Sequence, residues 1–235
     1  MRQNKERKKL SIIIPVLNEE AYVGNILRYL KTHCTSQVEE IIVVDGGSTD
    51  KTIAIAQKEG AKVLRSKPGR AVQLNFGAQN ARGDILYFLH VDTFPPAHFE
   101  KAILNAVSED YNAGCFQMRF DNNSRFLNFF AWFTRVNHRL CRGGDQSLFI
   151  DRELFDQSGG FDENFRVYED TEFIIRISKS ARFKILPQMV ITSARKYEQI
   201  GMFRLQYHFG VIHLKHMFGA GPEQLHNYYQ RHIAS

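Results

Sequence analysis

Apolar runs alternate with segments of helical periodicity over the first ninety residues. Residues 11–17 (SIIIPVL) and 40–45 (EIIVVD) are short and almost uniformly apolar, which is typical of strands buried on both faces of a parallel sheet. The segment between them, 19–32, places apolar side chains three and four positions apart, as one face of a helix does. The alternation continues as helix, strand, helix and strand at 51–59, 61–65, 70–82 and 83–89. This pattern predicts an α/β fold with a doubly wound, mostly parallel, Rossmann-like sheet and helices on both faces.

The alternation becomes less regular after residue 92. We expect helices at 97–107, 124–140, 169–178, 201–218 and 223–232, and strands at 113–120, at 146–150 and within 183–191. No internal repeat or long linker divides the chain, so we expect one domain at residues 11–200. A basic tail at 1–10 precedes it, and a helical extension at 201–235 follows and packs on it.

The composition excludes several classes of protein. The chain has 235 residues, of which 43% are hydrophobic and 24% charged, so it is not a disordered chain. Its formal charge is +6, but residues 1–10 hold five basic residues and one Glu, a net +4, which leaves +2 for the rest. A basic tail on a nearly neutral body argues against a nucleic-acid partner. We expect the tail to be a solvated end, with contact to anionic lipid as the alternative.

Cysteine usage and hydropathy bear on the compartment. Cys34, Cys115 and Cys141 are odd in number and have neither CxxC nor zinc-ligand spacing, which excludes a disulfide scaffold. No stretch approaches the roughly 20 apolar residues of a spanning helix, and the N-terminus lacks the apolar core of a signal peptide. We therefore expect a cytoplasmic protein and leave open a peripheral contact with the inner face of the membrane.

Acidic residues follow three of the predicted strands. The strands end in Asn18-Glu19-Glu20, in the turn at 45–50 (DGGSTD) and in His90-Val91-Asp92. Because ligands of open parallel sheets bind beyond the carboxyl ends of the strands, these segments are expected to border one site.

Two of these strand ends have a predicted chemistry. In the turn at 45–50 the glycines permit a tight bend and Ser48 or Asp50 can cap the next helix, whereas Asp45 is left to bind a base or ribose. If the strand extends to residue 92, His90 and Asp92 point the same way. Asp92 is then a ligand for Mg²⁺ or Mn²⁺, and His90 is acceptable for Mn²⁺. The alternative is a capping Asp beside a packed His.

A further pair of acids opens a predicted helix. Glu169 and Asp170 begin the apolar-faced segment 169–178, after a Gly-rich turn. Acids in a first helical turn also favour the helix dipole, so a purely structural role is one interpretation. The functional interpretation is a general base that accepts a proton from an attacking hydroxyl.

Four segments, in this order, resemble the inverting glycosyltransferases of family 2, which have the GT-A fold. They are SIIIPVLNEE at 11–20, IIVVDGGSTDKT at 41–52, the segment 69–93 that ends in LHVDT, and GGFDENFRVYEDTEF at 159–173. The resemblance implies inverting transfer of a single sugar from a nucleotide-sugar donor, with a divalent metal (Mg²⁺ or Mn²⁺) as cofactor. The acceptor, whether a sugar, a lipid or a small molecule, is not identified by it.

The resemblance also implies roles for individual residues. Asn18, Glu19 and Asp45 would contact the nucleoside, and Arg70 would lie near the diphosphate. Asp92, with His90, would hold the metal. Asp170 would be the general base, and Glu169 would position the loop or the acceptor. Asp145 and Gln146 belong to a GDQ segment similar to one in a subgroup of small bacterial transferases, where it would line the acceptor site.

Two departures from the family pattern matter. One carboxylate of the metal-binding DxD is replaced by His90, and the QxxRW motif of processive members is absent, although Arg195 in its neighbourhood could meet phosphate. Two alternative functions stay open. A sugar nucleotidyltransferase would need a basic, Gly-rich loop after the first strand, and a non-catalytic nucleotide-binding or scaffold protein would not need the acids.

Two aromatic-rich segments have no assigned role in this scheme. If 124–140 is one helix, Phe126, Phe129, Phe130, Phe133 and Val136 share a face, which predicts either core packing or a hydrophobic acceptor groove or interfacial surface. The segment 206–232 contains five histidines but no completing metal ligand, so we expect it to pack on the domain or on a membrane surface.

Overall fold

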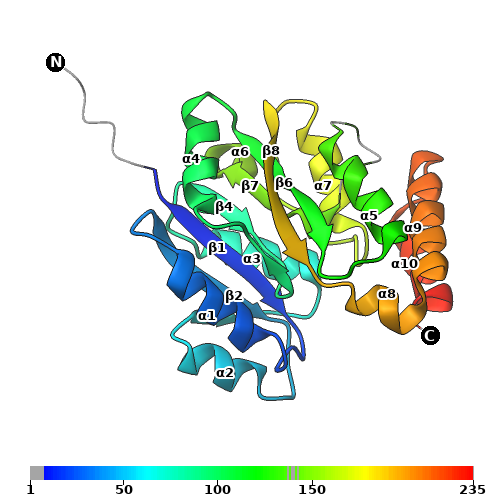
Figure 1. Ribbon diagram of the computed structural model, residues 1–235, viewed down its shortest axis with the longest axis horizontal. Helices are drawn as coiled ribbons and strands as arrows, with labels where there is room; N and C mark the ends of the chain where they lie inside the picture. Colours follow the sequence, from blue (N-terminus) through cyan, green and yellow to red (C-terminus); the bar gives the residue numbers. More distant parts are fainter. Residues whose placement is uncertain (1–7, 137, 139–140, 142, 235) are drawn as a thin grey trace.

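The protein, described as a computed structural model for residues 8–136, 138, 141 and 143–234, has one eight-stranded mixed sheet (Figure 1). Its strand order is β3-β2-β1-β4-β7-β6-β8-β5. The strands are β1 (Leu10–Val16), β2 (Val38–Asp45), β3 (Lys62–Arg65), β4 (Ile85–Phe88), β5 (Thr93–Phe94), β6 (Ala113–Phe120), β7 (Leu148–Asp151) and β8 (Phe183–Thr192). The first four of these strands are parallel neighbours, as the apolar runs predict.

The second half of the sheet is mixed. β7 runs antiparallel to both β4 and β6, β6 is parallel to β8, and the two-residue strand β5 is antiparallel to β8. The mostly parallel sheet is thus confirmed, and the antiparallel strands lie in the region where the alternation of helices and strands is lost.

Helices cover both faces of the sheet (Figure 1). The helices are α1 (Val23–His33), α2 (Thr52–Lys58), α3 (Arg70–Gln79), α4 (Phe99–Ser108), α5 (Arg125–Trp132), α6 (Arg152–Gln157), α7 (Glu169–Ile177), α8 (Arg195–Ile200), α9 (Met202–Met217) and α10 (Pro222–His232). Two 3₁₀ turns, η1 (Phe133–Arg135) and η3 (Gly144–Gln146), complete the elements used below.

The two cores follow the alternation of side chains along the strands. Ile12 and Ile14 of β1 belong to a core that includes side chains of α1, α4, α5 and the C-terminal helices. Ile13 points to the other face, into a core formed with α3, α6 and α7. Leu205, Ile212 and other side chains of the C-terminal helices share the first core, which packs these helices against the sheet domain.

The helix predicted at 124–140 is wrong in length. α5 ends at Trp132 and a 3₁₀ turn follows, because Thr134 turns inward: its hydroxyl donates to the Ala131 carbonyl (2.6 Å) and accepts from the Met118 amide (3.2 Å). Residues 137, 139 and 140 of the predicted helix lie outside the described residues. Leu127 and Ala131 are the buried side chains of α5, whereas Phe129 and Phe133 are exposed. Of the two interpretations of the Phe face, core packing is therefore wrong, and the groove or interfacial surface stays open.

Other boundaries differ by one to four residues, and three short elements were not predicted. The segment 19–32 begins its helix only at Val23, and the segment 70–82 ends its helix at Gln79. The unpredicted elements are β5, α6 and α8, with two, six and six residues, respectively. Elements of this length contain too few residues for a hydrophobic periodicity to be detected in the sequence.

Candidate functional site

The carboxyl ends of β1, β2 and β4 meet at one edge of the sheet, as the sequence predicts. A side chain from α3 joins two of them: the Gln73 amide donates to the carbonyls of Val16 (2.8 Å) and Val44 (2.7 Å). Gln73 is buried, so these hydrogen bonds are shielded from water. Gln73 was not predicted as a site residue, since a lone Gln on a helix has no sequence signal.

Asn18 and Asp45 organise the loops at this edge. The Asp45 carboxylate accepts from the amides of Gly47 (3.0 Å) and Ser48 (3.1 Å), and Asp45 is buried. The sequence argument left Asp45 without a structural role, and this turn supplies one. Asn18, which has a left-handed backbone (φ 54°), accepts from the Thr49 amide through its side chain and donates its own amide to the Ser48 hydroxyl, both at 2.8 Å.

Ser48 therefore does not cap α2. Asp50 accepts from the Thr52 amide (2.9 Å) at the start of that helix, but the N-cap position is Lys51, which makes no side-chain cap hydrogen bond, so neither Ser48 nor Asp50 is the N-cap.

Arg195 links the end of β8 to this same edge. Its guanidinium donates through both terminal nitrogens to the Glu19 carboxylate, at 2.8 Å each, and its Nε lies 2.9 Å from Oδ2 of Asp92. The guanidinium also stacks on the Tyr22 ring at 4.1 Å. The hydrogen bonds to Glu19, followed by the charge of Asp92, raise the pKa of Arg195. Arg195 is thus a fixed positive charge beside the predicted donor site.

The predicted alternation through His90, Val91 and Asp92 is wrong. β4 ends at Phe88, and a turn closed by a Thr93 amide to His90 carbonyl hydrogen bond (3.1 Å) follows. The two side chains consequently have different partners. Asp92 pairs with Arg195, whereas the His90 ring lies 3.4 Å from Oδ1 of Asp145 and 3.6 Å from Oδ2 of Asp170.

His90 is the centre of a charged cluster. Burial and the Arg70 charge disfavour the protonated ring, but the contacts with Asp145 and Asp170 outweigh them and raise the pKa of His90 to about 10. Burial opposes ionisation of Asp170, yet His90 and Arg70 together hold its pKa below the ordinary value. At neutral pH the cluster therefore contains a protonated imidazole next to an ionised Asp170.

Glu169 and Asp170 begin α7, as predicted, and both contact Arg70. Nη1 of Arg70 lies 3.2 Å from Oε1 of Glu169 and 3.6 Å from Oδ2 of Asp170. Burial and the neighbouring Asp170 raise the pKa of Glu169 to about 7. The side chain of Glu169 is 3% exposed and that of Asp170 is 15%, so Asp170 is the acid that an external hydroxyl can reach. Arg70 is therefore paired with Glu169 and Asp170, whereas the resemblance implied a position near the donor diphosphate.

The GDQ segment forms η3 against this cluster. A Cβ atom on Gly144 would lie 1.8 Å from Oδ2 of Asp170 and 2.9 Å from Cε1 of His90, so only glycine permits this approach. The Asp145 side chain is 47% exposed beside His90. Gln146 is buried and donates to the carbonyls of Phe116 and Thr134, both at 3.3 Å, which gives it a structural role in place of the predicted acceptor contact.

The backbone immediately before the acids is strained. Tyr168 has φ 71°, a left-handed conformation that is uncommon for an aromatic residue. Its hydroxyl lies 2.6 Å from Nδ1 of His213 on α9, and its ring contacts His216. Neither histidine was predicted to approach the site, because their contact with Tyr168 spans 45 residues or more.

The residues at this site provide only part of the ligands that a divalent cation requires. Mg²⁺ and Mn²⁺ bind through one or two carboxylates plus substrate phosphates, and the partly exposed Asp92 meets that requirement. His90 does not, because both ring nitrogens face carboxylates and a protonated imidazole has no lone pair for a metal. Within the described ranges, no group of three or more His, Cys, Asp or Glu side chains is placed to hold a metal ion.

None of the described helices combines the length and the apolar character needed to cross a bilayer.

Comparisons with known proteins relate most of the sheet domain to one family. The sequence pattern of glycosyl transferase family 2 matches residues 11–184. Glucosyl-3-phosphoglycerate synthase of Mycolicibacterium smegmatis is 34% identical over 101 residues, which are 39% of this chain and 33% of that protein. An uncharacterized glycosyltransferase of Rickettsia typhi is 31% identical over 189 residues, 72% of this chain and 58% of that protein. The chain thus spans between a third and three fifths of the length of these relatives.

Solved structures share the fold. The mannosyltransferase PcManGT of Pyrobaculum calidifontis, in complex with GDP-Man and Mn²⁺, superposes with a TM-score of 0.70 at 19% identity, over 96% of this chain and 70% of that one. Glucosyl-3-phosphoglycerate synthase of Mycobacterium tuberculosis, in complex with Mn²⁺ and UDP, gives 0.60 at 19% identity, over 77% and 70%. These similarities confirm the GT-A type of α/β fold, and the family pattern over residues 11–184 shows that the chain belongs to glycosyl transferase family 2.

Proposed function

We propose that the protein transfers a single sugar, with inversion, from a nucleoside diphosphate sugar to an acceptor hydroxyl. The observation that carries the proposal is the position of Asp170: it is ionised, partly exposed and held by His90 and Arg70 within the family's sequence pattern. The two solved transferases described above are complexes with UDP or GDP-Man, which supports a donor of this class.

The reaction is a displacement at the anomeric carbon. The Asp170 carboxylate takes the proton of the acceptor hydroxyl, whose oxygen forms the new bond to the anomeric carbon. The bond from that carbon to the donor diphosphate breaks, and the nucleoside diphosphate leaves with the electron pair. Glu169, which is almost fully buried, positions the start of α7 through Arg70 and does not meet the acceptor.

Positive charge is available for the leaving group on the donor side. Arg195 is held at the strand edge by Glu19 and Asp92, close to the Asn18 and Asp45 loops expected to bind the nucleoside. A divalent cation bound by Asp92 would supply further positive charge to the departing diphosphate. An incoming diphosphate can compete with both carboxylates for Arg195, because each is an anion on the same guanidinium.

The test of the base is Asp170→Asn, with Glu169→Gln as the matched variant. Asp170→Asn keeps the side-chain shape and removes the proton acceptor, so we expect kcat for a hydroxyl acceptor to fall about 10²–10⁴-fold. Nucleotide binding, measured by thermal shift, should persist. Full activity in Asp170→Asn would exclude it as the base, and nucleotide binding without turnover on any acceptor would favour the non-catalytic alternative.

The donor and the metal are tested together by thermal shift. A nucleotide at about 100 times its Kd adds about 2.7 kcal/mol, which is roughly 5–10 °C in Tm for a chain of this size. UDP, GDP and their sugars are each measured with and without Mn²⁺, in the natural protein and in Asp92→Asn. We expect one base to stabilise the protein, with an Mn²⁺ increment that Asp92→Asn removes. An increment that survives in Asp92→Asn would place the cation elsewhere.

A further inference from the structure

The exposed hydrophobic side chains are gathered in one region. The described part of the chain exposes ten large hydrophobic side chains, and nine of them belong to α5 with the turn after it and to α9 with its C-terminal end. Leu17 is the exception. Scattered exposed apolar residues need no explanation, but a concentration of this kind marks an interaction surface.

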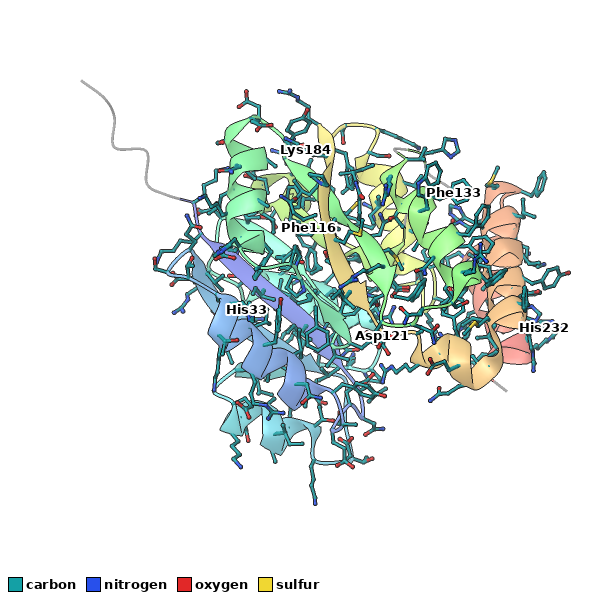
Figure 2. The ribbon with its side chains drawn as sticks, viewed as in Figure 1. His33, Phe116, Asp121, Phe133, Lys184 and His232 are labelled. Carbon is teal, nitrogen blue, oxygen red and sulfur yellow. The ribbon has the colours of Figure 1, made fainter. Side chains whose placement is uncertain are left out.

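Ring contacts make the α5 side of this region continuous with α9. Phe203 of α9 packs on Phe126 at 4.2 Å between ring centroids, and Phe126 contacts Phe130 at 5.0 Å. From Phe130 the contacts continue through Phe129 and Phe133 to Trp132, at 5.2–5.4 Å. Phe203 is nevertheless 71% exposed and Trp132 is 53% exposed. Figure 2 shows Phe133 on the side of the molecule where α9 lies.

α9 presents the second part of the same surface. Phe203, Tyr207, Leu214 and Phe218 are exposed, and their spacing of four, seven and four residues places them on one side of the helix. Leu205 and Ile212, on the other side, are buried against the domain. We call the exposed side chains of α5, η1 and α9 the aromatic face.

The charges within these segments have one sign. Residues 125–136 and 202–218 contain no Asp or Glu, and their Lys and Arg residues, all exposed, are Arg125, Arg135, Arg204 and Lys215. Aromatic side chains next to basic ones on a surface helix fit the interface of an anionic bilayer, where the rings enter the headgroup region and the cations meet phosphate.

A second copy of the chain fits this face less well. In a two-fold dimer the same patch lies against itself, which would bring the four basic side chains of one copy close to those of the other. We therefore propose that the aromatic face docks on a membrane surface that contains anionic phospholipid.

Docking there would bring the candidate catalytic residues near the bilayer. The inner side of α9 holds Tyr168 through His213, and Tyr168 directly precedes Glu169 and Asp170. The acceptor of the transfer would then be an amphiphile carried in the membrane. This statement about the acceptor rests on the proposed function, whereas docking itself does not.

The chain contains its own reporter for the experiment. Trp132 is the one Trp of the sequence and lies within the aromatic face. The full-length protein is mixed with vesicles of phosphatidylcholine, alone or with one quarter phosphatidylglycerol, without nucleotide. We expect co-flotation and a blue shift of Trp132 emission with the anionic vesicles, both weakened when NaCl is raised from 0.1 to 0.5 M. Co-flotation without a change in emission would exclude this face.

Paired variants separate the apolar and the charged contributions. Phe129→Ser with Phe203→Ser should lower the partition coefficient at least about tenfold, since two rings no longer leave water. Arg204→Gln and Lys215→Gln should each lower it about fivefold. The matched controls are Leu17→Ser and Lys58→Gln, exposed changes outside the face that should leave it unchanged.

Three other results would also overturn the proposal. They are no binding to anionic vesicles, equal losses in the controls and the paired variants, or a stable dimer of the natural protein that the Phe129 and Phe203 changes dissociate. The first result would leave the proposed transfer reaction intact, because the Asp170→Asn comparison measures turnover and not binding to vesicles.

Discussion

Gly144→Ala is a small change with a large expected effect on activity. The new Cβ would lie 1.8 Å from Oδ2 of Asp170, whereas ordinary contacts begin at 3.4 Å, so the carboxylate must move by 3.4 − 1.8 = 1.6 Å. A displacement of about 1 Å in a reacting group can cost about 100-fold in rate. We therefore expect kcat/KM to fall at least about 100-fold, or about 2.7 kcal/mol of transition-state stabilisation. Stability should fall as well, because Asp170 helps to raise the pKa of His90 and that contribution is lost when the carboxylate moves.

The matched control for this change is the preceding residue. Gly143 has an extended backbone (φ −168°) and a Cβ there meets nothing within 4 Å, so Gly143→Ala should behave as the natural protein does. Activity is followed as release of nucleoside diphosphate from the donor. A second readout is the NMR titration of His90, assigned with His90→Gln, whose pKa should fall from about 10 towards its ordinary value once Asp170 is displaced. Equal activity and equal titration in Gly144→Ala and Gly143→Ala would refute this account of the cluster.

Two further predictions concern the pH dependence of stability and the packing of α3. Because the folded pKa of His90 is about 10, above its ordinary 6.5, its contribution is complete below pH 6.5 and is lost as pH rises through 10. Between pH 6.5 and 10 the free energy of unfolding of the natural protein should therefore fall relative to that of His90→Gln, by at most about 1.4 kcal/mol per pH unit. The measurement is urea unfolding of both proteins at pH 6, 8 and 10. An equal dependence of the unfolding free energy on pH in the two proteins would contradict this. Gly77→Ala places a Cβ 2.5 Å from Ile13 and should lower the free energy of unfolding by about 1–3 kcal/mol. In Gly210→Ala, on α9, the new Cβ has no atom within 4 Å, and the free energy of unfolding should rise by about 0.5–1 kcal/mol. Equal urea midpoints for these two variants would contradict the packing argument.

Most of the parallel half of the sheet could be predicted because β1, β4 and the second half of β2 are buried on both faces. A strand such as β2, with uniformly apolar residues at 41–44, has no polar face to confuse with a helix, and its prediction missed only the first two residues. The direction of β7 could not be predicted in this way. Whether a strand runs parallel or antiparallel depends on its partners, and the partners of β7 lie more than 30 residues before it.

The candidate site was predictable as a set of strand ends but not as a set of contacts. The rule for parallel sheets placed Glu19, Asp45 and Asp92 at one edge, where they lie. It could not show that a turn after Phe88 separates His90 from Asp92, or that Gly144 lies against Asp170, since these depend on backbone angles and on packing over 26 residues or more. Packing of the extension 201–235 on the domain was predicted, but the side of α9 that is buried was not, because apolar residues occur on all sides of that helix.

The placement of β7 has a consequence for how the molecule unfolds. Four residue pairs join β7 to β4, but only two, Ala113–Ile150 and Gly114–Phe149, join it to β6. Gly114 permits this close approach, since a Cβ there would lie 2.5 Å from Cζ of Phe149 on β7. Apart from the two-residue edge strand β5, which also has two pairs to β8, the sheet is therefore joined by the fewest residue pairs at the β6–β7 boundary. A partial opening that begins there would detach β6, β8 and β5 as one unit while the strands that carry the predicted donor loops stay paired.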